Sequence, residues 1–377
     1  MKIGFDAKRA FQNNTGLGNY SRSLIDALAY GYPENDYYLF APKETIMYDW
    51  KKHPDMQLVT PQKKLHRWFK SAWRTKYVIS SLQEKGIQIY HGLSHEIPFG
   101  IHSSGVKSVV TMHDLIFERY PQQYNPIDVI TYRRKARYAC QYADKIVAIS
   151  IQTKEDLITY YNTPAEKIEV VYQSCDPAFA TIHPKVAVEA FRQKYQLPPK
   201  YFLYVGSLTE RKNLLGIVTA MHTLSPAQRL PLVVLGNGSS YKKKVKAALE
   251  ANGMTNDVIF LNEKARLENA ELPLLYQGAQ ALIYPSLFEG FGIPILEALW
   301  SGTPVITSAG SCFGETAGDA AIYVDPLKPA TIADAMIKIQ QDASLVDTLR
   351  NKGFIHAQRF APEKCAAAMM NVYNQLK

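Results

Sequence analysis

The chain has 377 residues, of which 47% are hydrophobic and 20% charged, so at about 150 residues per domain it is long enough for two globular domains. This composition excludes wholesale disorder, a collagen-like sequence and a small disulfide-stapled fold. Its 43 Lys and Arg residues against 34 Asp and Glu residues give a net charge of +9, which favours phosphate-bearing ligands, nucleic acid or an anionic membrane as partners without choosing among them.

The location of the protein is predicted from what its sequence lacks. The opening MKIGFDAKRAF becomes charged too early for a secretory signal peptide, and the apolar runs are far shorter than the roughly 18 residues of a membrane span. The four cysteines contain no CxxC pair, which argues against a zinc site and a disulfide framework. We therefore expect a cytoplasmic protein.

Short β-rich runs alternate with helical patterns along the chain, as is typical of parallel βαβ units. The predicted strands are residues 2–7, 37–41, 57–60, 87–91, 107–113, 145–149 and 168–172, then 201–205, 232–235, 258–261, 281–284, 304–308 and 321–324. This pattern predicts an α/β protein made of two Rossmann-like halves. Ligands of such sheets bind beyond the carboxyl ends of the strands, so we expect a cleft between the halves.

The boundary between the halves is predicted between residues 175 and 200, where several prolines interrupt regular structure. We place the first domain at residues 1–180 and the second at residues 181–361. The apolar periodicity of residues 362–377 predicts a terminal helix that must cover an apolar surface, and we expect it to return to the first domain.

A glycine-rich turn, NNTGLGNYS at residues 13–21, opens the first long predicted helix. Its spacing is similar to a dinucleotide fingerprint, but the glycines lie about nine residues beyond the strand, and no acidic residue ends a second strand where a ribose would need one. A turn that contacts an acceptor fits Gly16 and Gly18 better. An NAD(P)-dependent oxidoreductase remains an alternative function.

Residues 63–76, KKLHRWFKSAWRTK, hold six Lys and Arg residues and no acid. Leu65, Trp68, Phe69 and Ala72 recur at helical spacing, which is typical of an amphipathic helix on an anionic membrane. A core-packed helix with a solvated basic face explains the pattern equally well. On the first interpretation, the membrane would contact Lys63, Lys64, Arg67, Trp68, Lys70, Trp73 and Arg74.

His113 and Asp114 end the predicted strand 107–113, at the edge of a parallel sheet where ligands bind. A lone histidine is more often structural than catalytic, but this position favours a role in the site. The sequence has no D-x-D pair, the usual carboxylate cradle for a nucleotide-bound metal ion, so we expect no divalent metal.

In the second half, Arg211 and Lys212 follow the strand 201–205 and precede the next helix. Two cations at the carboxyl end of a strand can neutralise a diphosphate and stabilise the charge that develops on a leaving group. A solvated basic loop is the alternative interpretation.

The most informative segment is PSLFEGFGIPILE at residues 285–297, where a strand runs through a glycine loop into a helix expected to begin at Pro294. The N-terminus of a helix offers unpaired backbone N–H groups to a phosphate or sugar, and Gly290 and Gly292 would let such a ligand approach the backbone.

This segment also carries two carboxylates, Glu289 in the loop and Glu297 in the expected first helical turn. Carboxylates accept hydrogen bonds from the hydroxyls of a sugar or a ribose, and we expect the pair to line one edge of a pocket. In the alternative interpretation they only offset the helix dipole.

The segments PSLFEGFGIPILEALWSGTPVI, VGSLTERKN, MHDL and TGLGNYS cover nearly the whole chain and resemble the retaining GT-B glycosyltransferases of family four, glycosyl transferases group 1. The resemblance implies that the second domain binds a nucleotide-sugar, that the first binds the acceptor, and that no metal is needed. Many members carry arginine where this chain has Ser207, which leaves the cationic role of that donor-site position to Arg211 and Lys212.

The same resemblance implies individual roles. Glu289 and His113 would contact the donor sugar, and Glu297 the ribose. The backbone of Gly290, Phe291 and Gly292 would bind the sugar and diphosphate, with Arg211 and Lys212 also at the diphosphate, while Gly16 and Gly18 would shape the diphosphate and acceptor side.

The segment TMHDLIFERYPQQYN is similar to that of bacterial mannosyltransferases that make surface polysaccharide. This similarity suggests transfer of mannose from GDP-mannose to a glycan or lipid-linked acceptor, and a UDP-hexose is the alternative donor.

The sequence has no motif that reads nucleic acid, so we expect no nucleic-acid partner. A lipid-linked acceptor would suit peripheral attachment to the cytoplasmic face of the membrane.

Overall fold

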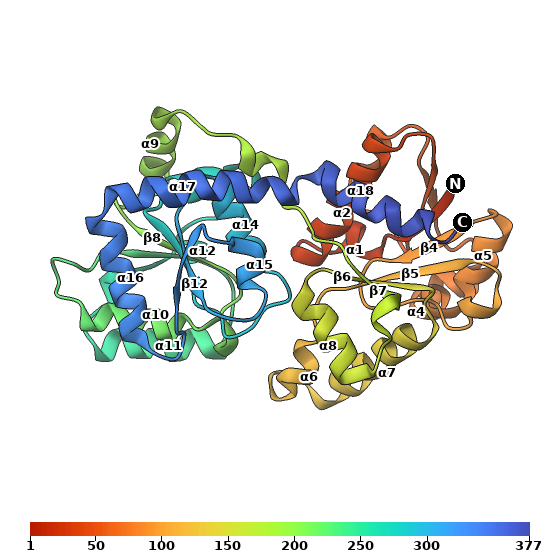
Figure 1. The fold of residues 1–377 in the computed structure, drawn as a ribbon, viewed down its shortest axis with the longest axis horizontal. Coiled ribbons are helices and arrows are strands. Elements are labelled where there is room, and N and C mark those ends of the chain that lie inside the picture. The colour runs from red at the N-terminus through yellow and green to blue at the C-terminus, as the bar shows by residue number, and fades with distance from the viewer. The chain divides into compact units, whose positions relative to one another are not determined.

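The structure is a computed structural model that describes residues 1–377, apart from the side chain of Leu65. The chain forms two compact units, drawn in Figure 1. The first unit comprises Met1–Cys175 together with Phe360–Lys377, and the second comprises Asp176–Arg359. The chain thus leaves the first unit before Asp176 and returns to it with its last helix.

The first unit is built on a seven-stranded parallel sheet in the order β3-β2-β1-β4-β5-β6-β7. Its strands are β1 (Lys2–Asp6), β2 (Asp36–Phe40), β3 (Gln57–Val59), β4 (Ile89–Gly92), β5 (Lys107–Met112), β6 (Lys145–Ala148) and β7 (Ile168–Val170). All seven predicted strands are present, with each end within two residues of the prediction.

The second unit has a six-stranded parallel sheet in the order β10-β9-β8-β11-β12-β13. Its strands are β8 (Phe202–Val205), β9 (Leu232–Leu235), β10 (Val258–Phe260), β11 (Ala281–Tyr284), β12 (Val305–Ser308) and β13 (Ala321–Val324). The prediction of two Rossmann-like sheets is therefore confirmed.

Helices connect the strands of both sheets. Those of the first unit are α1 (Lys8–Gln12), α2 (Gly16–Gly31), α3 (Lys64–Trp68), α4 (Lys70–Ala72), α5 (Val78–Glu84), α6 (Ile116–Arg119), α7 (Pro126–Tyr142), α8 (Ile151–Tyr161) and α18 (Pro362–Asn374). Those of the second unit are α9 (Lys185–Lys194), α10 (Leu214–Thr223), α11 (Ser240–Ala251), α12 (Leu261–Lys264), α13 (Leu272–Gln277), α14 (Ile293–Trp300), α15 (Phe313–Ala317), α16 (Pro329–Gln341) and α17 (Ala343–Ala357).

Short helical turns complete both units. They are η1 (Trp50–Lys52), the π-helical η2 (Trp73–Tyr77), η3 (Ile101–Ser103), η4 (Pro121–Gln123), η5 (Ala165–Lys167), η6 (Pro177–Ala180), η7 (Glu210–Lys212), η8 (Thr255–Asp257), η9 (Asn269–Glu271) and η10 (Gln358–Phe360).

The strand order reverses direction once in each sheet. In the first unit the switch lies between β1 and β4, and in the second between β8 and β11. In open α/β sheets the loops at the carboxyl ends of the two strands on either side of such a switch form the ligand site. Three of the segments that the sequence analysis singled out follow these strands: the glycine-rich turn at residues 13–21 after β1, Arg211 and Lys212 after β8, and residues 285–297 after β11. His113 and Asp114 instead follow β5, the neighbour of β4.

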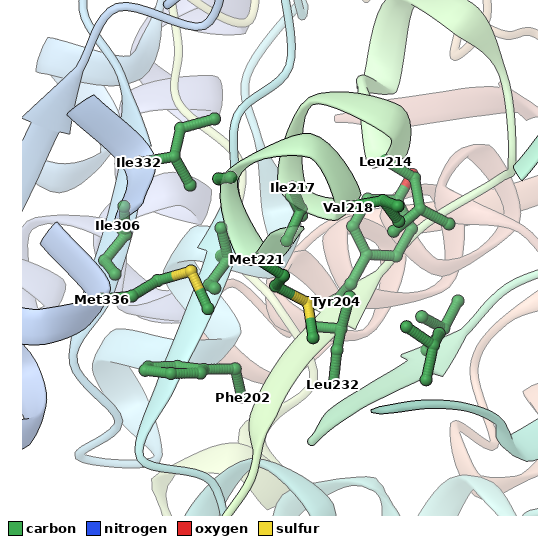
Figure 2. Close-up of a cluster of buried hydrophobic side chains, with 14 of the residues drawn as sticks. Phe202, Tyr204, Leu214, Ile217, Val218, Met221, Leu232, Ile306, Ile332 and Met336 are labelled. Carbon is green, nitrogen blue, oxygen red and sulfur yellow. The ribbon is translucent and has the colours of Figure 1, made fainter. Parts of the chain in front are cut away.

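An apolar layer holds helices onto each sheet, as Figure 2 shows for the second unit. Phe202 and Tyr204 on β8 lie in one buried cluster with Ile217 and Met221 of α10 and with Met336 of α16. Full burial of such a side chain contributes about 1.5–3 kcal/mol to stability. This layer fixes the strand ends that carry the site.

The C-terminal helix α18 packs on α2 within the first unit, as expected from its apolar periodicity. Met369 and Tyr373 belong to the buried core of this unit. The Tyr373 hydroxyl also lies 2.7 Å from Nδ1 of the buried His91, so this end of the chain is held by a polar contact as well as by burial.

The basic segment 63–76 is not the single amphipathic helix that its spacing predicts. Helix α3 ends at Trp68, and α4 starts anew at Lys70 after a non-helical Phe69. Trp68 is 87% exposed and Phe69 is 62% exposed, whereas Trp73 is only 2% exposed. The side chain of Leu65, which entered that prediction, lies outside the part that the structure describes.

The prediction that Arg74 contacts a membrane is wrong, because its side chain is buried and ion-paired. Its guanidinium lies 2.6 Å from the carboxylate of Asp6 and 3.0 Å from that of Glu96, and the side chain is 8% exposed. Trp73 and Arg74 therefore belong to the interior, because burial and ion pairing hold them there. No described helix is both long and apolar enough to cross a bilayer.

Candidate functional site

Two loops meet at the switch point of the second unit. The first follows β8 and contains η7, after which Asn213 takes a left-handed conformation and α10 begins. The second follows β11 and leads into α14. A backbone hydrogen bond of 2.8 Å from the Leu287 N–H to the Arg211 carbonyl joins the two loops.

The two loops bring Glu289 together with Arg211 and Lys212. Oε1 of Glu289 lies 2.7 Å from the Arg211 guanidinium and 2.8 Å from Nζ of Lys212. Lys212 also donates to the Tyr284 hydroxyl at 2.7 Å and lies over that ring, 4.9 Å from its centre. The structure thus assembles three of the predicted site residues around one carboxylate oxygen.

The charge of Glu289 follows from this arrangement. The side chain is buried, and burial alone would raise its pKa, but Lys212 and Arg211 outweigh burial and hold the pKa below its ordinary value. Glu289 is therefore ionised at neutral pH. It can accept hydrogen bonds, but it has no proton to give as a general acid.

The start of α14 requires a glycine. Gly292 precedes the helix at φ +96°, a left-handed conformation that side chains strain. The helix begins at Ile293, one residue earlier than predicted. The Phe291 side chain is buried in the core, so this residue can offer a ligand only its backbone, while Ser207 in the other loop is exposed.

Glu297 occupies a different environment from Glu289. It lies one residue further into α14 than predicted, just beyond the first turn, and it accepts a 2.6 Å hydrogen bond from the Tyr276 hydroxyl. Burial raises the pKa of Glu297 to about 7, although the bond from Tyr276 opposes this rise. The two carboxylates therefore differ in charge near neutral pH.

His113 is buried at the carboxyl end of β5 in the first unit. Its Nε2 lies 2.9 Å from the Leu93 carbonyl, and its ring meets the edge of Tyr20 at a centroid distance of 4.7 Å. Burial lowers the pKa of His113 to about 3, so the imidazole is neutral. Its hydrogen-bonded nitrogen is then a donor, and the ring is held within its own unit.

The sequence analysis missed His95, which follows β4. It is a non-glycine residue at φ +61°, and strained backbone of this kind occurs often at functional sites. Its Nε2 accepts the His113 backbone N–H at 3.0 Å, so Nδ1 carries the proton. The run Ser94-His95-Glu96 after a predicted strand was the signal that could have found it.

Gly16 and Gly18 lie at the start of α2, after the short helix α1 that the sequence did not predict. A Cβ atom on Gly18 would lie 1.8 Å from the Asn13 carbonyl oxygen, so this position excludes a side chain. Gly16 has open space around it. The close approach of the Asn13 carbonyl therefore explains why position 18 holds a glycine.

Nothing in the described part of the chain gathers three His, Cys, Asp or Glu side chains in a way that could hold a metal ion. The four cysteines are buried, and none forms a disulfide in the described structure.

Comparison with known proteins identifies the chain's family. The family model described as glycosyl transferases group 1 matches residues 187–355, and that described as glycosyltransferase family 4 matches residues 16–179. The chain is 30% identical to the O-antigen chain mannosyltransferase B of Escherichia coli over 76% of its own length and 74% of that protein. It is 29% identical to the O-antigen chain mannosyltransferase RfbU of Salmonella typhimurium over 64% and 63% of the two chains.

Solved structures share the fold at low sequence identity. HepE of Anabaena, in complex with UDP-glucose, aligns over 100% of both chains with a TM-score of 0.77 at 16% identity. WaaG, a glycosyltransferase involved in lipopolysaccharide biosynthesis, aligns over 99% of both chains with a TM-score of 0.72 at 18% identity. The chain belongs to glycosyltransferase family 4, has the GT-B fold of two Rossmann-like units, and is an enzyme of the hexosyltransferase class.

Proposed function

We propose that the chain transfers a hexose with retention from a nucleotide-sugar to a glycan or lipid-linked acceptor in the synthesis of a surface polysaccharide. The observation that carries this proposal is the cluster of Glu289, Arg211 and Lys212 at the switch point of the second unit. We assign donor binding to the second unit and acceptor binding to the first. The domain boundaries proposed from the sequence, residues 180 and 361, lie within five residues of the limits of the two units.

The charges suggest how the leaving group departs. When the bond between the anomeric carbon and the phosphate oxygen breaks, negative charge develops on the nucleoside diphosphate. Arg211, Lys212 and the N-terminus of α14 would stabilise that charge. The acceptor hydroxyl attacks the same face of the sugar and gives its proton to the departing phosphate. In this mechanism the protein supplies neither a general acid nor a covalent nucleophile.

The ion pairs of Glu289 add a step to donor binding. Both cations are paired with the one carboxylate in this structure, so the cluster keeps one positive charge in excess. A diphosphate must compete with Glu289 for Arg211 and Lys212, and the displaced carboxylate would then be available to hydroxyls of the donor sugar. Glu297 would accept from the ribose, and the N–H groups of Gly290, Phe291 and Gly292 would contact the sugar and diphosphate.

The remaining roles belong to the first unit. We propose that His113 contacts the donor sugar and that Gly16 and Gly18 shape the diphosphate and acceptor side. Because the single N–H of the neutral imidazole donates to the Leu93 carbonyl, His113 would accept a hydrogen bond from a sugar hydroxyl at Nδ1 and would not act as a charge.

The donor is proposed to be GDP-mannose. The curated relatives named as O-antigen mannosyltransferases support mannose, while the UDP-glucose bound to HepE keeps a UDP-hexose as the second candidate. A thermal-shift panel of GDP-mannose, UDP-glucose, UDP-galactose and ADP-glucose separates the two. The largest rise in Tm with GDP-mannose, followed by transfer from it, is the expected outcome. A rise in Tm with UDP-sugars alone would show that the donor is a UDP-hexose and not GDP-mannose.

Peripheral membrane attachment is proposed for the exposed part of the basic segment alone: Lys63, Lys64, Arg67, Trp68 and Lys70. Exposed tryptophan beside lysines and arginine suits an anionic interface. Flotation with phosphatidylglycerol vesicles tests this, with phosphatidylcholine as the control. Binding should be lost when the four cations are reversed to glutamate, and unchanged flotation of that variant contradicts the proposal.

A further inference from the structure

The first unit contains a cavity of about 190 Å³. It is lined by residues that follow β1, β4 and β5, including Arg9, Ser94, His95, Glu96 and Asp114. The cavity thus lies at the carboxyl edge of the sheet, beside the switch between β1 and β4, where open α/β sheets bind ligands. It is smaller than the roughly 300–1,000 Å³ of pockets for drug-sized ligands, so it suits one sugar ring and not a nucleotide-sugar.

The polar lining combines donors and acceptors at fixed positions. Glu96 is held by Arg74 at 3.0 Å and by Lys135 of α7 at 2.8 Å, and Asp114 by the Ile116 N–H at 3.0 Å. His95 presents its protonated Nδ1, since Nε2 is engaged by the backbone. The carboxylates of Glu96 and Asp114 are balanced by two cations of the same lining, Arg9 and Lys135. A lining without net charge that both donates and accepts suits hydroxyl groups better than it suits a phosphate.

Aromatic rings line another part of the cavity. Phe117 is buried, and its ring packs against Tyr132 at a centroid distance of 5.7 Å. Tyr124 meets Tyr132 edge to face at 6.1 Å. Tyr132 stays 42% exposed although it has two aromatic neighbours. The ring of Tyr132, fixed by these two neighbours, offers an apolar surface to the C–H groups of a pyranose.

We propose that this cavity binds one neutral pyranose ring of the acceptor, with Tyr132 against the ring and Asp114 accepting from its hydroxyls. The proposal rests on the function proposed above, and it adds the chemical class of the group that the first unit recognises. It makes Tyr132 and Asp114 residues that determine acceptor specificity. Charge-bearing acceptor groups, such as a lipid phosphate, would bind elsewhere.

Saturation-transfer NMR on the full chain tests this assignment. The probes are the methyl glycosides of mannose, glucose, galactose and N-acetylglucosamine, with glycerol 3-phosphate as the anionic comparison. At least one glycoside should bind the wild-type protein. Its dissociation constant should rise tenfold or more in Tyr132→Ala and in Asp114→Asn, which keeps an oxygen for the Ile116 N–H. Tyr160→Ala is the matched control, because Tyr160 is 40% exposed and lies outside the cavity lining.

Binding of GDP-mannose and UDP-glucose to the same variants separates this proposal from the proposed donor site. If no glycoside binds, if binding is unchanged in Tyr132→Ala, or if glycerol 3-phosphate displaces the glycoside, the cavity is not a sugar subsite. Those outcomes leave nucleotide-sugar binding intact. Loss of the donor proposal would appear instead as failure of every nucleotide-sugar to bind while the glycoside still does.

Discussion

Each unit of this enzyme places a glutamate between two cations at the carboxyl edge of its sheet. Glu96 follows β4 and contacts Arg74 and Lys135, while Glu289 follows β11 and contacts Arg211 and Lys212. β4 and β11 hold equivalent places, each next to the first strand of its unit at the switch point. In each case the cations outweigh burial and lower the pKa of the glutamate, that of Glu96 to about 2.

The origin of the cations distinguishes the two clusters. Arg74 and Lys135 come from separate helical elements, and Arg74 is also paired with Asp6 on β1. These contacts tie distant segments together. Arg211 and Lys212 are instead consecutive residues of one short turn, facing the loop that leads into α14. A glutamate between two cations is therefore not enough to indicate a donor site. In the first unit the same arrangement joins separate segments of the chain.

The largest effect is expected when the cluster of the first unit is broken. Arg74→Met leaves the buried Asp6 without the guanidinium that it is paired with, which should lower the free energy of unfolding by about 3–5 kcal/mol. Arg67→Met, in the exposed part of the same segment, should change it by less than about 0.5 kcal/mol. Chemical denaturation followed by tryptophan fluorescence measures both. Equal effects of the two substitutions would show that the Asp6 pair is not structural.

Breaking the cluster of the second unit should affect catalysis. Lys212→Ala removes one of the two cations proposed to bind the diphosphate, and loss of one such group costs about 10²–10³-fold in rate. Glu289→Gln, which keeps shape and removes charge, should also reduce transfer strongly, and neither variant should unfold. Lys244→Ala, an exposed ion-paired lysine of the same unit, is the control. Transfer within threefold of wild type in Lys212→Ala would contradict the donor assignment.

Acid should weaken the first unit before the second. Burial lowers the pKa values of His91 and His113 to about 3 and that of His95 to about 4, below the 6.5 of an unfolded chain. The unfolded chain then binds more protons below pH 6.5, so stability is full above that pH and falls as the pH drops. The loss is about 1.4 kcal/mol per pH unit for each histidine.

Hydrogen exchange at pH 7.5, 6.5 and 5.5, corrected for the intrinsic exchange rate, resolves the two units. Protection of β4 and β5 should decrease with acidification more than protection of β8 and β11. If both sheets lose protection equally, the buried histidines do not govern the acid response.

The smallest expected effect concerns Glu297, whose raised pKa of about 7 should make donor binding depend on pH. In the proposed ribose contact the ionised carboxylate can accept from both hydroxyls, so the dissociation constant of the nucleotide-sugar should fall severalfold between pH 6 and 8. Tyr276→Phe removes a hydrogen bond that lowers this pKa, so the change should move to higher pH. A profile that is the same in Glu297→Gln would rule out the ribose contact.

Much of this enzyme could be predicted from sequence because its strands are short apolar runs with clear ends. The loops that follow β8 and β11 were also predictable, since glycines and charges mark them. The basic segment was not, because periodicity cannot show that Arg74 pairs with Asp6, which lies 68 positions away. The place of His95 after a predicted strand was a usable signal, but its bond to the His113 backbone joins positions 18 apart and could not be predicted from the sequence.

We propose above that the diphosphate of the donor displaces the carboxylate of Glu289 from its ion pairs with Arg211 and Lys212. Isothermal titration of GDP-mannose and of free GDP into the wild-type chain, Lys212→Ala and Lys244→Ala tests it most directly. We predict that both ligands bind the wild type and Lys244→Ala alike, and that Lys212→Ala binds them at least tenfold more weakly. Equal affinity of Lys212→Ala and the wild type for both ligands would contradict the account.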